Sequence, residues 1–392
     1  MSLASLQHVE KLFGTMICAL LHGPAKLIPK PQNMNPDHVK KVLVVKFFGI
    51  GSLVLATPFF RQAKKKFPNA EIHLLTLSSN RVVMDMIEDI DQTHYVDLGG
   101  NVVAAIGAYV GTLWRAFRGH YDVLIDLEFY TRASAVVALA SWAPVRIGYH
   151  ASGIYRGGLH SHRVPFNSYW HVKRNFLSLL EPYGYCHSGN IVQPMLNIPD
   201  AITDKVQPFI DKTDGRYVVI NVNAGELAYE RRWDPKSFAA LAARLSMKYE
   251  IPCIFIGAPS ERVYVQAVVD QAVSQGGHAI NSAGELDLVS MTQLCRESNL
   301  VISNDSGPLH VAAATGVPVV GFFGPETPVL YGPVGVGHLV FHEPLSCSPC
   351  INIEQGKRLK CWHDRAICQE ATSVEKAFSE ISKTFDDVLK QK

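Results

Sequence analysis

A short polar turn, Asn304–Gly307, follows one apolar run and precedes a second apolar segment that begins at Pro308. Proline suits the first position of a helix, because its missing N–H would have no partner there. The free N–H groups at a helix start, together with the helix dipole, bind anions such as phosphate. The alternative is an ordinary helix that Asp305 or Ser306 caps. The candidate phosphate-binding residues are Asp305, Ser306, Gly307 and His310.

Two further loops could add to a site of this kind. In the first, Arg231 and Arg232 follow an apolar run, and either guanidinium could bind a phosphate through two N–H groups. A solvated basic pair is the alternative. In the second, Glu261 lies just inside a helix after a glycine turn. Its carboxylate could accept hydrogen bonds from ribose hydroxyls or merely complement the helix dipole.

Another loop lies near the start of the chain, in the stretch VVKFFGIGSLVLATPFF. This stretch predicts a strand, a short turn over Gly49–Ser52, and a helix that Ser52 opens. The turn has the composition of a loop that holds a polar substrate. Further along, Asp126 and Glu128 end the apolar run VLIDLEFY. Because they are two positions apart, we expect both carboxylates on the same face of a strand.

Four of the eight cysteines cluster near the C-terminus with the spacing C-x2-C-x10-C-x6-C. Thiols stay reduced in the cytoplasm, so such a cluster suggests a metal before disulfides. Four thiolates can close a tetrahedral site for structural zinc or iron, although the spacing is irregular for a zinc ribbon. Reduced thiols and disulfides are the alternatives, and no catalytic role is expected. The residues are Cys347, Cys350, Cys361 and Cys368.

The stretches that must position these residues alternate between two patterns. Short apolar runs rich in β-branched residues, such as KVLVVKF and YDVLIDL, are typical of buried parallel strands, and helical stretches lie between them. One series ends near residue 185, and a second begins at RYVVINVNAG. We therefore expect an α/β chain of two doubly wound, Rossmann-like domains facing a cleft. Ligands of such sheets bind beyond the carboxyl ends of the strands, where the candidate residues lie.

Composition restricts the partners. A formal net charge of +2 argues against a general nucleic-acid binder, and no apolar run is long enough to span a bilayer. No secretory signal is recognisable, so we expect a cytoplasmic chain. Apolar residues near the N-terminus have helical spacing, with Lys11, Lys26 and Lys30 around them. Such a helix could lie peripherally on the anionic inner membrane, or pack on the domain or a partner chain.

These motifs, in this order, resemble those of glycosyltransferase family 9, the bacterial lipopolysaccharide heptosyltransferase family. The family pattern vRxxxxGDxxxxxP corresponds to residues 46–58, and yDxxiDlqxxxRs corresponds to 121–134. A basic-Trp motif stands at 231–233, and GxxxE stands at 257–261. The most specific signature, DSGxxHxAAAxGxPxxxxFGPxxP, matches 305–328 nearly residue for residue. The resemblance covers most of the chain.

The resemblance implies a GT-B architecture and an inverting, direct displacement that needs no metal or other cofactor. The C-terminal domain would bind a nucleotide-activated sugar, such as ADP-heptose, through Arg231 to phosphate, Glu261 to ribose, and Asp305–Gly307 with His310 to the diphosphate-sugar. The N-terminal domain would bind a glycan or lipid-linked acceptor, with Gly49 and Gly51 on the acceptor side. The expected divisions are 1–36, an amphipathic segment; 37–190, the acceptor domain; 191–215, a linker; 216–371, the donor domain with the cysteine cluster of 347–368; and 372–392, a helix that crosses back to the acceptor domain.

The resemblance fails at one position. Displacement by a sugar hydroxyl needs a general base, which in the family is the aspartate of the first loop, and here that position is Ser52. The base could have moved to Glu128, where the family more often has glutamine, or to Asp126. The two carboxylates could equally be structural, bonding Arg132 and nearby backbone.

The leading prediction is an inverting glycosyltransferase that moves heptose to a lipopolysaccharide-core or related bacterial glycan. A catalytically degenerate, nucleotide-sugar- or glycan-binding partner subunit and a protein-directed glycosyltransferase are the alternatives.

Overall fold

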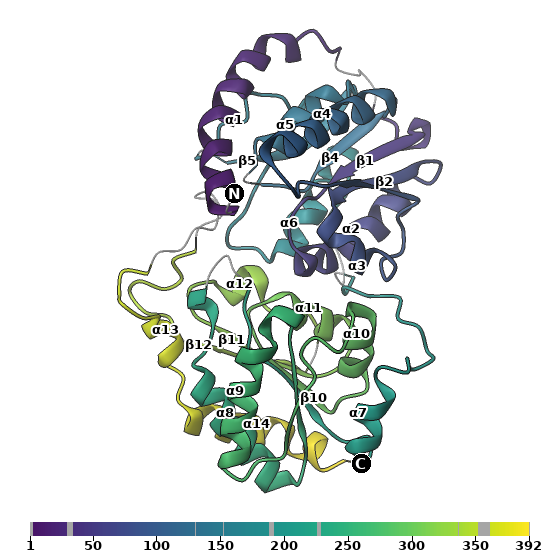
Figure 1. Cartoon of the computed structure of the whole chain (residues 1–392). Helices are drawn as coiled ribbons and strands as arrows, with labels where there is room; N and C mark the ends of the chain where they lie inside the picture. Colours follow the sequence, from purple (N-terminus) through teal and green to yellow (C-terminus); the bar gives the residue numbers. More distant parts are fainter. Residues whose placement is uncertain are drawn as a thin grey trace. The chain divides into compact units, whose positions relative to one another are not determined.

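The computed structural model describes residues 3–29, 34–129, 131–151, 153–187, 192–225, 229–335, 337–351 and 361–391, with side chains from residue 13 onward. The described residues form two compact units, which meet in the sequence between Val192 and Gln193. Each unit contains a six-stranded parallel sheet covered by helices (Figure 1). Both units are therefore α/β, as the alternating sequence pattern predicts.

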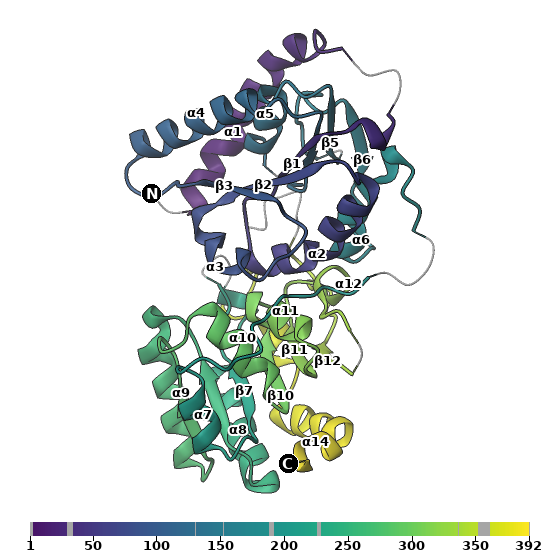
Figure 2. The same ribbon diagram turned by 90° about the vertical axis from the view of Figure 1, so that its right-hand side faces the viewer.

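The first unit has the strand order β3-β2-β1-β4-β5-β6, which is the doubly wound order. Helices α1 and α4 both contact α5, and α2 contacts α6 separately (Figures 1 and 2). The strands are β1 Lys41–Val45, β2 Glu71–Leu77, β3 Gln92–Val96, β4 Val123–Asp126, β5 Val145–His150 and β6 His162–Pro165. The helices are α1 Leu3–Ala25, α2 Ile50–Lys66, α3 Arg81–Met84, α4 Val102–Arg118, α5 Ala133–Ala140 and α6 Val172–Ser178.

The second unit repeats this topology, with the order β12-β11-β10-β7-β8-β9. In both sheets the strand order reverses between the first and fourth strands of the unit, which is where such folds bind ligands. The strands are β7 Val218–Asn221, β8 Cys253–Ile256, β9 Ala279–Asn281, β10 Leu300–Asn304, β11 Val319–Phe323 and β12 Leu339–His342. The helices are α7 Gln207–Lys212, α8 Pro235–Tyr249, α9 Arg262–Ser274, α10 Leu288–Arg296, α11 Gly307–Ala314, α12 Pro328–Tyr331, α13 Ile367–Glu370 and α14 Val374–Lys390.

The last helix, α14, packs on α8 and β12 within the second unit (Figure 2). Its apolar face enters the core of that unit through Ala377, Ile381, Phe385 and Leu389. This face completes the apolar cover of the second sheet, which would otherwise be exposed to water. The crossing of this helix to the N-terminal domain stays a prediction.

No helix in the described part of the chain combines the length and apolar character needed to cross a membrane.

Candidate functional site

At the turn between β10 and α11, the side chain of the N-cap residue does not cap the helix start. Ser306 occupies the N-cap position in an extended conformation, with φ −158° and ψ 170°, but makes no capping hydrogen bond. Its hydroxyl lies instead 2.9 Å from Asn221 Nδ2 and 3.1 Å from Ser303 Oγ. Ser306 therefore leaves the first-turn N–H groups of α11 uncapped among the described residues. Uncapped N–H groups at a helix start can bind an anion.

A guanidinium lies beside this helix start. Arg231 Nη1 is 3.2 Å from Asp305 Oδ2, and the Asp305 side chain is almost fully buried. Arg231 Nε is also buried, and within the described residues it has no hydrogen-bond partner. Asp305 therefore holds the arginine next to α11, where its positive charge and the helix dipole act on the same space.

The neighbouring Arg232 has a different environment. Its guanidinium lies between the rings of Tyr229 and Tyr264, at 4.6 Å and 5.0 Å from their centroids. One of its N–H groups donates to the Ala224 carbonyl at 3.3 Å. Arg232 is thus held by cation–π stacking, whereas Arg231 pairs with the signature turn. Of the two arginines left open by the sequence, the geometry favours Arg231 as the phosphate ligand.

An asparagine that sequence reasoning missed joins these loops. Asn304 Oδ1 accepts a hydrogen bond from the Trp233 backbone N–H at 2.8 Å, and Asn304 Nδ2 donates to the Val222 carbonyl at 3.0 Å. The Trp233 ring is buried and stacks on Phe322 with centroids 4.2 Å apart. Asn304 and Asn221 both end strands at the point where the sheet order reverses. The sequence did contain a signal for them, because an asparagine stands at the end of both apolar runs, in NVNAG and in SND.

Glu261 caps its own turn. It ends a 3-10 turn, Pro259–Glu261, and α9 begins only at the next residue. Its Oε2 accepts a hydrogen bond from the Ala258 N–H at 2.8 Å. This contact is a local hydrogen bond within the turn, and ribose binding by Glu261 stays a prediction. His310, the last predicted donor-side residue, is buried on α11.

In the first unit, the loop after β1 ends two residues earlier than expected. Helix α2 begins at Ile50, because Gly49 adopts φ +90°, a left-handed conformation that glycine favours. Ser52 is therefore the third residue of α2 and does not open the helix. Within the described chain its hydroxyl has no hydrogen-bond partner, and its side chain is partly exposed.

Glu128 forms hydrogen bonds with the start of this same loop. Its Oε1 lies 2.7 Å from Lys46 Nζ and accepts hydrogen bonds from the N–H groups of Phe47 and Phe48, at 2.8 Å and 3.1 Å. Lys46 also donates to the Phe48 carbonyl at 2.6 Å. The Glu128 side chain is fully buried. This geometry is that of a carboxylate that organises a loop.

Asp126 belongs to a second buried network. Its Oδ2 pairs with Arg156 and lies 3.0 Å from His160 Nε2, while its Oδ1 accepts from the Glu128 N–H at 3.0 Å. Burial opposes the charged form of Asp126, but the Arg156 charge and the His160 contact outweigh it and lower the pKa of Asp126. Strand β4 ends at Asp126. The strand alternation therefore does not reach Glu128, and the two carboxylates bond different partners instead of sharing a face.

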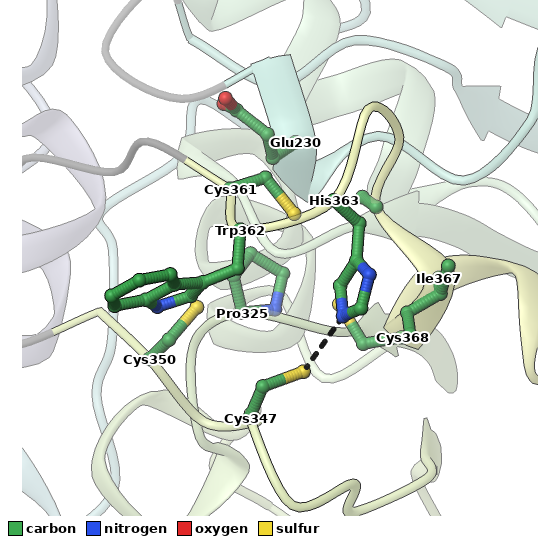
Figure 3. A pocket seen from close by; sticks show the side chains of 10 residues that line it. Glu230, Pro325, Cys347, Cys350, Cys361, Trp362, His363, Ile367 and Cys368 are labelled. Carbon is green, nitrogen blue, oxygen red and sulfur yellow. Dashed lines mark hydrogen bonds between the residues drawn. The ribbon is translucent and has the colours of Figure 1, made fainter.

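The four clustered cysteines lie together in the second unit (Figure 3). They line a cavity of about 10 Å³ with His363, which sequence reasoning missed although it stands next to Trp362 within the cluster. Cys347 Sγ lies 3.9 Å from His363 Nε2. All four are free thiols, and burial followed by the nearby thiols raises the pKa of Cys368 to about 11. Among the described residues, no group of three or more His, Cys, Asp or Glu side chains has the arrangement of a metal-ligand set.

Two Rossmann-like sheets of equal topology are the architecture of the GT-B fold class. A family model for glycosyltransferase family 9 (heptosyltransferase) matches residues 110–363, so the chain belongs to this family.

Comparisons with known proteins agree with this assignment. The chain is 22% identical over 336 residues to lipooligosaccharide heptosyltransferase 2 of Haemophilus ducreyi, covering 83% of this chain and 95% of that protein. Among solved structures, it matches a family 9 glycosyl transferase from Veillonella parvula with a TM-score of 0.72 and 24% identity, covering 90% and 99% of the two chains. The ADP-heptose heptosyltransferase II of E. coli gives a TM-score of 0.68 and 17% identity, covering 88% and 99%.

Proposed function

We propose that this glycosyltransferase moves heptose from an ADP-linked donor to a lipopolysaccharide-core or related glycan, with inversion at the sugar. The observation that carries the proposal is the Arg231 guanidinium beside Asp305 at the uncapped start of α11. The relatives named above are lipooligosaccharide and ADP-heptose heptosyltransferases, which supports this choice of donor and acceptor.

The donor chemistry follows from charge. When the sugar–phosphate bond breaks, negative charge develops on the leaving diphosphate. Backbone N–H groups at a helix start and a fixed arginine stabilise such charge without reorganising at the moment of reaction. Arg231 and the Asp305–Gly307 turn supply both groups, and no metal is required in this scheme. Glu261 is assigned to the ribose, with its second carboxylate oxygen available for that contact, and His310 to the diphosphate-sugar.

On the acceptor side, the group that must be identified is the general base. A general base must reach the acceptor hydroxyl, within about 2.6–3.2 Å. Glu128 and Asp126 are both fully buried in ion pairs, which supports a positioning role for them. The family's base position is Ser52, next to Gly49 and Gly51 at the start of α2. These features favour one second candidate function, in which the chain binds the nucleotide sugar as a partner subunit and transfers slowly or not at all.

The experiment measures binding and transfer separately. Calorimetric titration with ADP, with UDP as the comparison, tests the donor site, and Arg231→Met is expected to weaken ADP binding by about ten-fold or more, because charge-assisted hydrogen bonds contribute roughly 1.5–3 kcal/mol. Arg262→Met, on the exposed side of α9, is the matched control. Mass spectrometry of a truncated lipopolysaccharide core incubated with ADP-heptose tests transfer. ADP binding without heptose transfer would select the second function, and no ADP binding would exclude both.

We also propose that the enzyme works in the cytoplasm at an anionic membrane surface, through the outer faces of α1 and α4. Both helices contact α5 (Figures 1 and 2), and α4 contains arginines but no acidic residue. Apolar side chains flanked by cations suit anionic lipid, whereas a symmetric dimer through this face would oppose like charges. The exposed apolar residues are Phe13, Met16, Ile17 and Leu20 on α1, and Val102, Val103, Ile106, Val110, Trp114 and Phe117 on α4.

A further inference from the structure

An open cavity of about 680 Å³ lies beside the C-terminal ends of α4 and α5, two helices of the first unit that contact each other (Figures 1 and 2). This volume is typical of a small-molecule site. Most of its lining is aromatic, and the residues are Phe117, His120, Tyr121, Ser141 and Trp142. None of them belongs to the donor or acceptor residues assigned above.

The cavity lies at the opposite edge of the first sheet from the candidate acceptor residues. Tyr121 precedes β4 and Trp142 precedes β5, so both stand at the amino ends of two parallel neighbours. Glu128 and Ser52 follow β4 and β1, which are also parallel neighbours, and stand at the carboxyl ends. The length of β4 separates the two edges by roughly 13 Å, at about 3.3 Å per residue. A ligand of the cavity therefore does not occupy the acceptor site.

Trp142 has a backbone conformation that favours glycine. It follows Ser141, the C-cap of α5, and adopts φ +56°. Glycine is the usual residue at such a helix end, because a side chain is strained in the left-handed region. Trp142 nevertheless leaves 55% of its surface exposed, so it gains little from burial. The stability of the fold does not account for a tryptophan here, whereas a ligand that stacks on the exposed ring does.

The walls of the cavity are held in place without a ligand. The Tyr121 hydroxyl lies 3.1 Å from His73 Nδ1 and 3.2 Å from His94 Nε2. Gly119 allows this position of the ring, because an added Cβ there would overlap Tyr121. Ser141 is also fixed, since its hydroxyl donates to the Ala138 carbonyl at 2.7 Å. A preformed wall of this kind lowers the entropic cost of binding.

The chemistry of the lining selects the class of ligand. The faces of the three aromatic rings are electron-rich and attract the polarised C–H groups of a sugar ring. None of the described lining residues carries a carboxylate, and Arg118 lies over the nearby Trp114 ring, which disfavours a cationic ligand. The exposed His120 ring makes no hydrogen bond within the described chain, so its nitrogens are available to hydroxyl groups. An acyl chain would remove water from His120 without replacing it.

We propose that this cavity binds one pyranose ring of a glycan, stacked on Trp142 and hydrogen-bonded to His120. The pyranose assignment follows from the cavity itself, and only the choice of an oligosaccharide probe rests on the proposed function. Because the cavity is at the far edge of the sheet, the bound ring is not the one that receives the transferred sugar. A second contact of this kind raises the effective concentration of a long glycan at the enzyme.

The first test measures sugar binding by saturation-transfer NMR, which observes the ligand. Methyl α-D-mannopyranoside and a deacylated lipopolysaccharide-core oligosaccharide should both bind saturably. Trp142→Gly should weaken binding by about ten-fold or more, and His120→Gly by about three- to ten-fold. Trp362→Gly, at an exposed tryptophan of the second unit, is the matched control and should bind like the unchanged protein. Absence of saturable sugar binding, or binding of hexanol but of neither sugar, would overturn the proposal.

The second test separates ligand stacking from packing. Because glycine suits φ +56°, Trp142→Gly should keep its melting temperature within about 3 °C of the unchanged protein. A loss of much more than this would assign Trp142 to packing and contradict the stacking role. ADP titration of Trp142→Gly should match that of the unchanged protein. If the unchanged protein binds the sugars but not ADP, the proposed function has failed while the cavity assignment stands.

Discussion

Lys46 and Glu128 form an ion pair in the first unit, with Nζ 2.7 Å from Oε1 and both side chains almost completely buried. Removing one partner of a buried pair leaves an uncompensated charge, which typically costs about 3–5 kcal/mol. We therefore expect Lys46→Met to lower the free energy of unfolding by about that amount, as measured by urea denaturation.

The matching change at Glu128 separates a structural role from a catalytic one. Glu128→Gln keeps an acceptor for the Phe47 and Phe48 N–H groups but removes the charge that faces Lys46. We expect lower stability, partly restored in the Lys46→Met/Glu128→Gln double variant. Loss of transfer with unchanged stability would instead support Glu128 as the relocated base.

His160 makes the first unit sensitive to acid. Burial and the nearby Arg156 and Arg146 lower the pKa of His160 from 6.5, although Asp126 opposes them. Below about pH 6.5 the unfolded chain therefore binds more protons than the folded chain, and the free energy of unfolding must fall as the pH decreases. The Asp126 contribution has a separate window, because its lowered pKa keeps its stabilisation until the pH falls below 3.8.

The measurement is urea unfolding at a series of pH values. His160→Gln is expected to flatten the slope below pH 6.5, with His150→Gln as the control at an exposed histidine. The slope will not vanish, since burial also lowers the pKa of His94. A slope equal to that of the unchanged protein would contradict the assignment to His160.

Ser52 allows a gain-of-function experiment. It lies in the first turn of α2, where a carboxylate interacts favourably with the helix dipole by about 0.3–1 kcal/mol. Ser52→Asp should therefore fold and be slightly more stable, and it restores an acid where the family has its base. We expect faster heptose transfer than in Ser52→Asn, which has the same size without the charge. Equal transfer rates would show that this position no longer supplies the base.

Asn304 is expected to stabilise the loops of the donor site. Asn304→Ala leaves the Trp233 N–H and the Val222 carbonyl without their partner, and each buried orphan costs roughly 1–3 kcal/mol. We predict a loss of about 2 kcal/mol or more in unfolding free energy and weaker ADP binding. Asn69→Ala, which removes an exposed hydrogen bond to Asp37, is the control and should change neither quantity appreciably.

The apolar face of α4 predicts lipid-dependent binding. Val103→Glu/Ile106→Glu adds two negative charges to exposed positions, so co-sedimentation with phosphatidylglycerol vesicles should weaken by about ten-fold or more. Val263→Glu, at an equally exposed position in the second unit, should bind like the unchanged protein. Binding to neutral phosphatidylcholine vesicles should be weak. Failure to bind anionic vesicles, with a concentration-dependent dimer instead, would refute the membrane proposal.

The α/β architecture was predicted from strong local patterns of apolar residues, and the structure contains the predicted elements. The apolar runs became parallel strands because their β-branched residues are buried on both faces, and the Asp305–Gly307 turn lies at a strand end as expected. Contacts between segments that are distant in the sequence could not be predicted from these local patterns. The pairing of Asp126 with Arg156 depends on which loops the sheet brings together, 30 residues apart in sequence. For the same reason, the choice of Arg231 over Arg232 rested on the family resemblance and not on local patterns.

Helix α14 shares its core with the strands that carry the donor-site turns. Trp233, at the end of the arginine motif, donates from its indole to the Thr372 carbonyl, immediately before that helix. The core of the second unit is therefore incomplete until α14 has been synthesised. A chain that lacks α14 should be unstable in its second unit, although it keeps every predicted site residue.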